Sequence, residues 1–340
     1  MPEIRRNSIS DQIVLVAPER RQRPNEFAAA RTASDLTRSD STRSDSTRCP
    51  FCPGNEDATP PAVEELHAAD SPNQWLVRVV PNLYPAVFDL DQGEPPVVEG
   101  RTPALGKHEV VIECRRHVRQ FTELSHQESE LAFLAYQRRF QAWKQNPQLR
   151  FGIALKNSGE QAGASMEHVH SQLIGLTEIP PIAQTELDSA LRHYESRGSC
   201  VFCDLLADEN RQPLRIVDQN DHFTALCPRA SRFAYEIWIL PHGHVSHFED
   251  DAPETIAEAA RFLRHNLRRL QGLTPSPAYN YLIHSAPFDT NPNDHYHWHI
   301  EVLPRLGHLA GFELGTGYSI NAVAPEQAAL ELRDVSLGKV

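Results

Sequence analysis

One series of short motifs occurs twice along the chain, and this repetition constrains the fold more than any other feature. Each series opens with a Cys-x-x-Cys pair, Cys49 and Cys52 in the first half and Cys200 and Cys203 in the second. An extended run that ends near a proline follows, and then come the similar segments HEVVIECRRHVRQF and YEIWILPHGHVSHF. Each series closes with two apolar runs that carry histidines. Because the order is the same in both halves, the sequence predicts an internal duplication.

Local patterns predict strands and one long helix in each half. The two similar segments share a glutamate at one position and alternate β-branched or aromatic residues with others, which is typical of strands. A helix is expected after each segment, because a capping box stands at Ser125-x-x-Glu128 in one half and at Asp251-x-x-Glu254 in the other.

The repeated pattern as a whole predicts an α+β fold. We expect two related halves, residues 1–180 and 195–335, each with antiparallel strands and flanking helices. The closing strands of the two halves are expected to pair with each other across a pseudo-two-fold axis.

Composition excludes several classes of protein. No stretch approaches the roughly 18 consecutive apolar residues of a membrane span, and the opening MPEIRRNSIS lacks the apolar core of a secretory signal. We therefore expect a cytoplasmic protein with no membrane partner. The formal net charge of -12 argues against a nucleic-acid partner, since such surfaces carry a basic stripe. Without a secretion signal, paired cysteines favour metal binding over disulfides.

Each cysteine pair has two histidines at matching places in its half. The first set is Cys49, Cys52, His117 and His168, and the second is Cys200, Cys203, His244 and His297. Two cysteines and two histidines complete a tetrahedral zinc site with no open position, so we expect two structural zinc ions per chain. His242, His247 and His299 are alternative ligands in the second half. Reduced, buried cysteines beside unrelated histidines are the alternative to metal binding.

The segment NSGEQAGASMEHVHSQLIGL combines a small polar loop with a His-x-His-x-Gln strand. The loop backbone is suited to a close approach to phosphate. On a strand, His168, His170 and Gln172 point to one face. The first histidine can then bind metal, His170 can attack phosphorus, and the amide of Gln172 can donate to a phosphoryl oxygen. In the alternative, His170 is a further metal ligand.

This strand carries a family resemblance. His168-Val169-His170-Ser171-Gln172 resembles the motif of the histidine triad (HIT) superfamily, and the chain from Arg20 to the Asn321 region resembles the galactose-1-phosphate uridylyltransferase branch of that superfamily. The resemblance implies a duplicated HIT-like domain, a homodimer with composite active sites, and catalysis by His170 with Gln172. Its substrates would be a nucleoside diphosphate sugar and a sugar 1-phosphate.

The resemblance also implies a set of substrate-binding residues. They are Arg20 and Arg23 at the nucleotide phosphates, Asn82 at the base and ribose, Asn157 and Ser165 at the diphosphate, and Phe312 and Glu313 in the closing segment AGFELGTGYSIN.

Three departures from the uridylyltransferase pattern leave the nucleobase open. Val169 stands where the familiar motif has proline, Ala164 replaces a cysteine, and AGFELGTGYSIN resembles a group that includes ADP-glucose phosphorylases. The leading prediction is uridylyl transfer from UDP-glucose to galactose 1-phosphate through a nucleotidyl-histidine. Adenylyl transfer from ADP-glucose to phosphate, and a non-catalytic zinc-stabilised nucleotide-binding protein, are the alternatives.

Two further expectations concern regions outside the nucleophile strand. In the second half Trp298 and Glu301 replace Val169 and Gln172, and no glycine-rich loop precedes them, so we expect no catalysis there. The polar stretch LTRSDSTRSDSTR predicts a mobile loop, with a lid over the site as the alternative.

Overall fold

A computed structural model of the protein describes residues 3–10, 12–16, 49–68, 71–93, 103–292, 294–307 and 310–337. Arg20, Arg23 and the SDSTR repeat lie outside the described residues. The predictions made for them are therefore not addressed by the fold.

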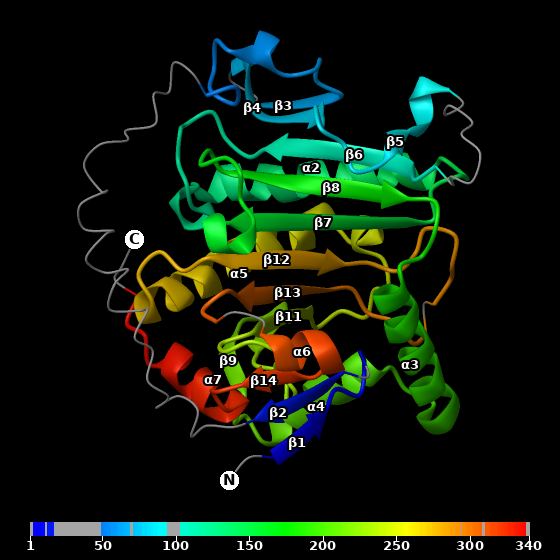
Figure 1. The fold of residues 1–340 in the computed structure, drawn as a ribbon, viewed down its shortest axis with the longest axis vertical. Coiled ribbons are helices and arrows are strands. Elements are labelled where there is room, and N and C mark those ends of the chain that lie inside the picture. The colour runs from blue at the N-terminus through cyan, green and yellow to red at the C-terminus, as the bar shows by residue number, and fades with distance from the viewer. Residues whose placement is uncertain are drawn as a thin grey trace.

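Strands and helices share the described part of the chain, and Figure 1 shows their arrangement. The strands are β1 (Glu3–Arg6), β2 (Ile13–Val16), β3 (Glu64–Ala68), β4 (Ser71–Pro81), β5 (Phe88–Asp89), β6 (Leu105–Ile112), β7 (Phe151–Ser158), β8 (His170–Leu176), β9 (Ile216–Gln219), β10 (Phe223–Leu226), β11 (Ile237–Pro241), β12 (Tyr279–His284), β13 (His299–Pro304) and β14 (Ser319–Asn321). The helices are α2 (His126–Lys144), α3 (Pro181–Arg197), α4 (Val201–Arg211), α5 (Pro253–Leu273), α6 (Gly311–Thr316) and α7 (Pro325–Arg333).

The strand order confirms the predicted duplication. One 11-stranded sheet runs β3-β4-β6-β8-β7-β12-β13-β11-β10-β9, with β5 beside β6, so the second half repeats the first in reverse order (Figure 1). The two halves meet where β7 pairs with β12 in antiparallel register, with Asn157 opposite Asn280. The α+β architecture and the pairing across a pseudo-two-fold axis are therefore as expected.

Helices α2 and α5 cover one face of this sheet, and the main hydrophobic core lies between them and the strands (Figure 1). Ser125 caps α2: its side chain accepts from Glu128 N–H, and Glu128 accepts from Ser125 N–H. Strand alternation turns Val111 and Leu173 toward α2 and leaves Val110 and the catalytic candidates on the opposite face. The candidate site therefore lies on the face away from the two long helices.

The predicted capping box of the second helix is wrong. Helix α5 begins at Pro253, its N-cap is Ala252, and no side chain caps it. Proline is favoured at the first helical position because its missing N–H would be unpaired there anyway. Asp251 instead accepts the indole N–H of Trp298 at 2.8 Å.

The glutamates aligned by sequence in the two similar segments are also not equivalent. Glu109 accepts from Arg139 of α2, whereas Glu236 accepts from the indole of Trp238 on the opposite face of the sheet. The register explains this difference, because Val110 lies opposite Gln172 and Trp238 lies opposite Glu301. One residue of offset moves a strand side chain to the other face.

A smaller sheet, β1-β2-β14, lies beside α4, α6 and α7 (Figure 1). It joins the N-terminal segment to the end of the second half, since β14 pairs with β2 in parallel. Among the described residues, no helix combines the length and apolar character needed to cross a bilayer.

Candidate functional site

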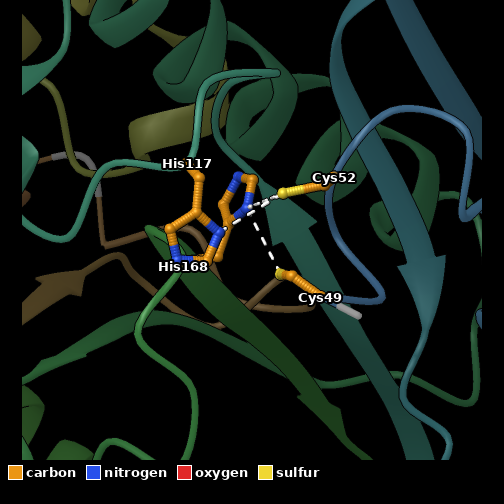
Figure 2. A group of neighbouring side chains, drawn as sticks. All are labelled: Cys49, Cys52, His117 and His168. Carbon is orange, nitrogen blue, oxygen red and sulfur yellow. Dashed lines mark hydrogen bonds between the residues drawn. The ribbon is translucent and has the colours of Figure 1, made fainter. Parts of the chain in front are cut away.

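The structure brings the first predicted metal set to one point (Figure 2). Cys49 and Cys52 lie on the loop before β3, while His117 follows β6. His168 comes just before β8. The sulfur of Cys52 is 3.3 Å from His117 Nδ1 and 3.5 Å from His168 Nδ1, and Cys49 Sγ is 3.6 Å from His168 Nδ1. Sulfur and nitrogen ligands of a tetrahedral zinc ion lie about 3.5 Å apart. The four residues therefore fit a tetrahedral metal ion.

The ring of His168 is held for this role by its other nitrogen. Its Nε2 lies 2.9 Å from the backbone oxygen of Cys114. A carbonyl oxygen only accepts, so Nε2 carries the hydrogen and the lone pair on Nδ1 faces the cysteines. Burial lowers the pKa of His168 to about 4, which keeps the ring neutral, as a metal ligand must be.

The second predicted set also comes together, and its residues are more exposed than those of the first set. Cys203 Sγ lies 3.2 Å from His244 Nδ1 and 3.8 Å from His297 Nδ1, and with Cys200 all ligand atoms lie within 4.8 Å of one another. His244 is exposed, and Nε2 of His297 is buried without a hydrogen-bond partner among the described residues. The second group can hold a metal ion but lacks the carbonyl that orients His168.

The three alternative ligands of the second half lie elsewhere. Nε2 of His242 is 2.9 Å from Thr224 Oγ1, and Nε2 of His247 is 3.1 Å from the backbone oxygen of Pro287. His299 belongs to a different cluster, described below. The cysteines of the second set therefore meet His244 and His297, as predicted.

His170 opens strand β8 and does not belong to the metal group. Its Nδ1 lies 2.7 Å from the backbone oxygen of His168, so Nδ1 carries the hydrogen and Nε2 has the lone pair. Burial lowers the pKa of His170, and the nearby ammonium of Lys156 lowers it further. The ring is therefore neutral near pH 7, with the nucleophilic form of Nε2 available.

Two cavities meet at His170. One, of about 230 Å³, is polar and includes Asn157 and Ser165 in its lining. The other, of about 210 Å³, is more apolar, and its lining includes Phe51 and Asn82 together with side chains of β4 and β6. Such a junction can accept a phosphate next to an aromatic base.

Gln172 lies on the same face of β8 as His170, and both line the more apolar cavity. Its Oε1 is 2.8 Å from Nε2 of His108, a buried residue of β6. Among the described residues, the side-chain hydrogen bond of Gln172 is this one, made by its oxygen. The amide N–H groups are thus available to a group in the cavity.

The other predicted substrate residues divide into two groups. Ser165 lines both cavities, and Asn157 lines the polar one with its Oδ1 accepting from Asn280 Nδ2 at 2.7 Å. Asn82 lines the more apolar cavity. Phe312 and Glu313 lie on α6 and line neither cavity.

Two basic residues of the site were not predicted. Lys156 is buried beneath β8 and donates to the backbone oxygen of His170 at 2.7 Å and to Glu113 Oε2 at 2.5 Å. Tyr136 also donates to Glu113, at 2.7 Å. This network fixes the start of β8 below the nucleophile.

His108 is the second basic residue of the site that was not predicted. In sequence, each is only a basic residue next to an apolar run.

A third cluster lies in the second half, at the position equivalent to His170. Its members are Glu186, His284, His299 and Glu301. Burial opposes charge on His284, but Glu186 and Glu301 raise the pKa of His284 to about 10. Arg232 forms a further ion pair with Glu301. The buried carboxylates are thus paired with cations of the chain itself.

Comparisons with known proteins identify the family. A sequence profile for the galactose-1-phosphate uridyl transferase N-terminal domain matches residues 1–180, and a profile for a domain of unknown function, DUF4921, matches residues 104–335. An ADP-glucose phosphorylase of Arabidopsis thaliana is 31% identical, over 99% of this chain and 93% of the relative. The chain belongs to the galactose-1-phosphate uridylyltransferase family. Its predicted resemblance to the HIT superfamily is confirmed.

Other members of this family agree. A galactose-1-phosphate uridylyltransferase of Thermotoga maritima is 25% identical, over 99% of each chain. The crystal structure of an ADP-glucose phosphorylase from Arabidopsis thaliana with bound ADP-glucose has a TM-score of 0.83 and 30% identity, over 99% of this chain and 100% of the other. The protein is therefore a nucleotidylyltransferase of the family that holds both kinds of enzyme, with a duplicated HIT-like fold.

Proposed function

We propose that this protein transfers a nucleotidyl group from a nucleoside diphosphate sugar to an acceptor phosphate, with His170 as the nucleophile. The observation that carries the proposal is the hydrogen bond from His170 Nδ1 to the backbone oxygen of His168, which leaves the Nε2 lone pair for attack. Gln172 would donate to the phosphoryl oxygen as charge develops. Asn157 and Ser165 would contact the diphosphate, and Asn82 the nucleoside.

The nucleobase has two candidates. Uridylyl transfer between UDP-glucose and galactose 1-phosphate remains the leading prediction from the resemblance of the chain as a whole. Similarity favours the other candidate, because the ADP-glucose phosphorylase of Arabidopsis thaliana is 31% identical and the uridylyltransferase of Thermotoga maritima 25%. We therefore place adenylyl transfer from ADP-glucose beside uridylyl transfer as the function to test.

Zinc is the metal that the two Cys-Cys-His-His sets favour, with one ion at each set. Four protein ligands leave no position for water, so the proposed role is structural. The metal beside His168 would anchor the strand that carries His170. Metal analysis of the purified protein tests this, and fewer than two ions per chain would contradict the duplicated site.

A homodimer would explain the residues that lie apart from the cavities. Phe312 and Glu313 line neither cavity beside His170, so their predicted contact with substrate requires a second copy of the chain. Arg20 and Arg23 are proposed to contact the nucleotide phosphates. The two halves, residues 1–180 and 195–335, remain predicted domains. A monomer by light scattering at micromolar concentration would count against composite sites.

The decisive experiment is incubation with UDP-glucose, ADP-glucose and related sugars, followed by intact mass measurement. The mass added would name the nucleotide, and peptide mapping would place it on His170. His170→Gly with added imidazole is a second arm, because imidazole can occupy the vacated space and restore part of the transfer. Normal adduct formation by His170→Ala would remove His170 as the nucleophile.

A further inference from the structure

Both ring nitrogens of His108 are engaged, and they reach two different parts of the site. Nδ1 accepts from the backbone N–H of Ala86 at 3.0 Å. Nε2 lies 2.8 Å from Gln172 Oε1 and 3.0 Å from Asn82 Nδ2. The ring therefore touches the proposed phosphate donor and the loop that carries Asn82.

The Ala86 contact decides where the ring hydrogen lies. A backbone N–H can only donate, so Nδ1 is the acceptor and the single hydrogen of a neutral imidazole is on Nε2. That hydrogen points to Gln172 Oε1, whereas Asn82 Nδ2 is itself a donor and makes no hydrogen bond to the protonated Nε2. Burial lowers the pKa of His108, although the contact with Gln172 opposes this, and the neutral ring is the form that fits both contacts.

The orientation of the Gln172 amide follows from this tautomer. With Oε1 held by His108, the amide nitrogen is turned away from β6 and its hydrogens are left for the cavity shared with His170. A free glutamine amide can rotate and present oxygen instead, which would repel a phosphoryl oxygen. The hydrogen bond from His108 prevents this rotation.

The backbone oxygen and Nδ1 of His108 fix the loop that carries Asn82, the residue proposed to contact the nucleoside. The backbone oxygen of His108 accepts from Asn82 N–H at 2.8 Å, and Nδ1 accepts from Ala86, so His108 binds the loop at two points. Within the loop, Tyr84 N–H donates to Asn82 Oδ1 at 2.8 Å. The side chain of Asn82 is thus held at the wall of the more apolar cavity.

We propose that His108 is a positioning residue, which aims the amide of Gln172 at the phosphoryl group and holds the Asn82 loop against the nucleoside. The inference rests on the proposed nucleotidyl transfer through His170. It assigns one residue to two separable effects, one on the rate of transfer and one on binding.

Two substitutions separate these effects. Asparagine can place an oxygen near the Nδ1 position, and glutamine can place an N–H near the Nε2 position. His108→Asn should keep the Ala86 contact and lose the Gln172 contact, so kcat should fall by about tenfold to a hundredfold with KM nearly unchanged. His108→Gln should keep most of kcat and raise KM for the nucleoside diphosphate sugar. His222→Asn, at an exposed histidine of the second half, is the matched control.

A double-mutant cycle tests whether His108 acts through Gln172. The measurement is the single-turnover rate of adduct formation on His170, followed by intact mass. In the Gln172→Ala background, His108→Asn should have little further effect. An equal loss in both backgrounds, or equal changes in kcat and KM for the two His108 variants, would overturn the positioning role alone. Absence of any adduct on the unmodified protein would overturn the proposed function and this inference with it.

Discussion

The two halves of the chain build the same strand arrangement around a histidine. Within the described residues, the histidine of the first half lies beside two cavities, whereas that of the second half is fully buried. His170 lies between two cavities and next to the ring of Phe51, with centroids 5.3 Å apart. Its counterpart His299 is stacked on His284 at 4.6 Å and packed against Phe202 at 4.9 Å, with no exposed surface.

The partners of the two histidines differ in charge. In the first half, Gln172 and Asn157 are neutral and turn toward the cavities. In the second, register places Glu301 and His284 at the equivalent positions. His284 donates to Glu186, and Arg232 pairs with Glu301. A buried, ion-paired cluster thus occupies the position that the first half keeps for a ligand. The Nε2 atoms of His284 and His299 have no hydrogen-bond partner among the described residues, so this group could also hold a metal ion.

This difference indicates that a Cys-Cys-His-His group and a histidine beside a cavity are separable features of this fold. Each half has a Cys-Cys-His-His set, and each has a histidine two residues after the second metal histidine. In the first half, the neutral side chains of Gln172 and Asn157 leave room beside His170 for a ligand. The second half is expected to contribute stability in place of chemistry.

The largest expected effect distinguishes the two histidines directly. His170→Ala should reduce transfer by about a thousandfold or more, because the covalent intermediate cannot form. Both zinc ions should remain bound. His299→Ala should keep the transfer activity and lower thermal stability. Turnover and metal content of the two variants check this. Loss of zinc together with activity in His170→Ala would make His170 a ligand.

Removal of one metal ligand should weaken the whole fold. Cys49→Ser is expected to lose the first zinc ion and about 5 kcal/mol or more of unfolding free energy, since metal binding is linked to folding. Urea unfolding and metal analysis measure both quantities. Cys227→Ala, at a buried cysteine outside both metal sets, should keep two zinc ions. Equal stability of Cys49→Ser and the unmodified protein would contradict a structural metal.

Substitution of Gln172 should affect kcat, whereas substitution of Glu301 should affect stability. Gln172→Ala should reduce kcat by about a hundredfold, as for the loss of one oxyanion donor, without changing stability. Glu301→Gln should leave kcat unchanged and reduce unfolding free energy by about 3 kcal/mol, because it leaves buried cations without one partner. Steady-state kinetics and urea unfolding separate the two results. A slow, stable Glu301→Gln variant would show that the second half takes part in catalysis.

The smallest effect concerns the order in which metal leaves. His244 is exposed and Nε2 of His297 has no partner among the described residues, whereas His168 is held by the Cys114 carbonyl. Loss of such an outer contact weakens metal binding by about tenfold or more. A chelator titration should therefore remove the ion of the second set, at His244 and His297, before the ion at His168. Its removal should cause little loss of transfer activity. Simultaneous loss of both ions would show that the two sites are equivalent.

The grouping of each Cys-Cys-His-His set could be predicted from sequence because residue type and spacing carry that information by themselves, while metal binding at these groups stays a prediction. The duplication could be predicted from the order of the motifs. The equivalence of Glu109 and Glu236 could not, because a single residue of offset exchanges the faces of a strand and leaves the alignment looking equally good. His108 was missed because its partners are distant in sequence: Gln172 comes near it through the pairing of β6 with β8, and Ala86 through the loop between β4 and β5.

The seam between β7 and β12 has a consequence for how such a chain can be divided. Both strands are interior because they pair with each other, and Asn280 reaches across the seam to hold Asn157. Separation of the halves would expose a row of unpaired backbone groups on each, which is a template for pairing with any other edge. In the intact chain, each half therefore covers the strand edge of the other. A fragment that contains only the first half, with His170, should self-associate.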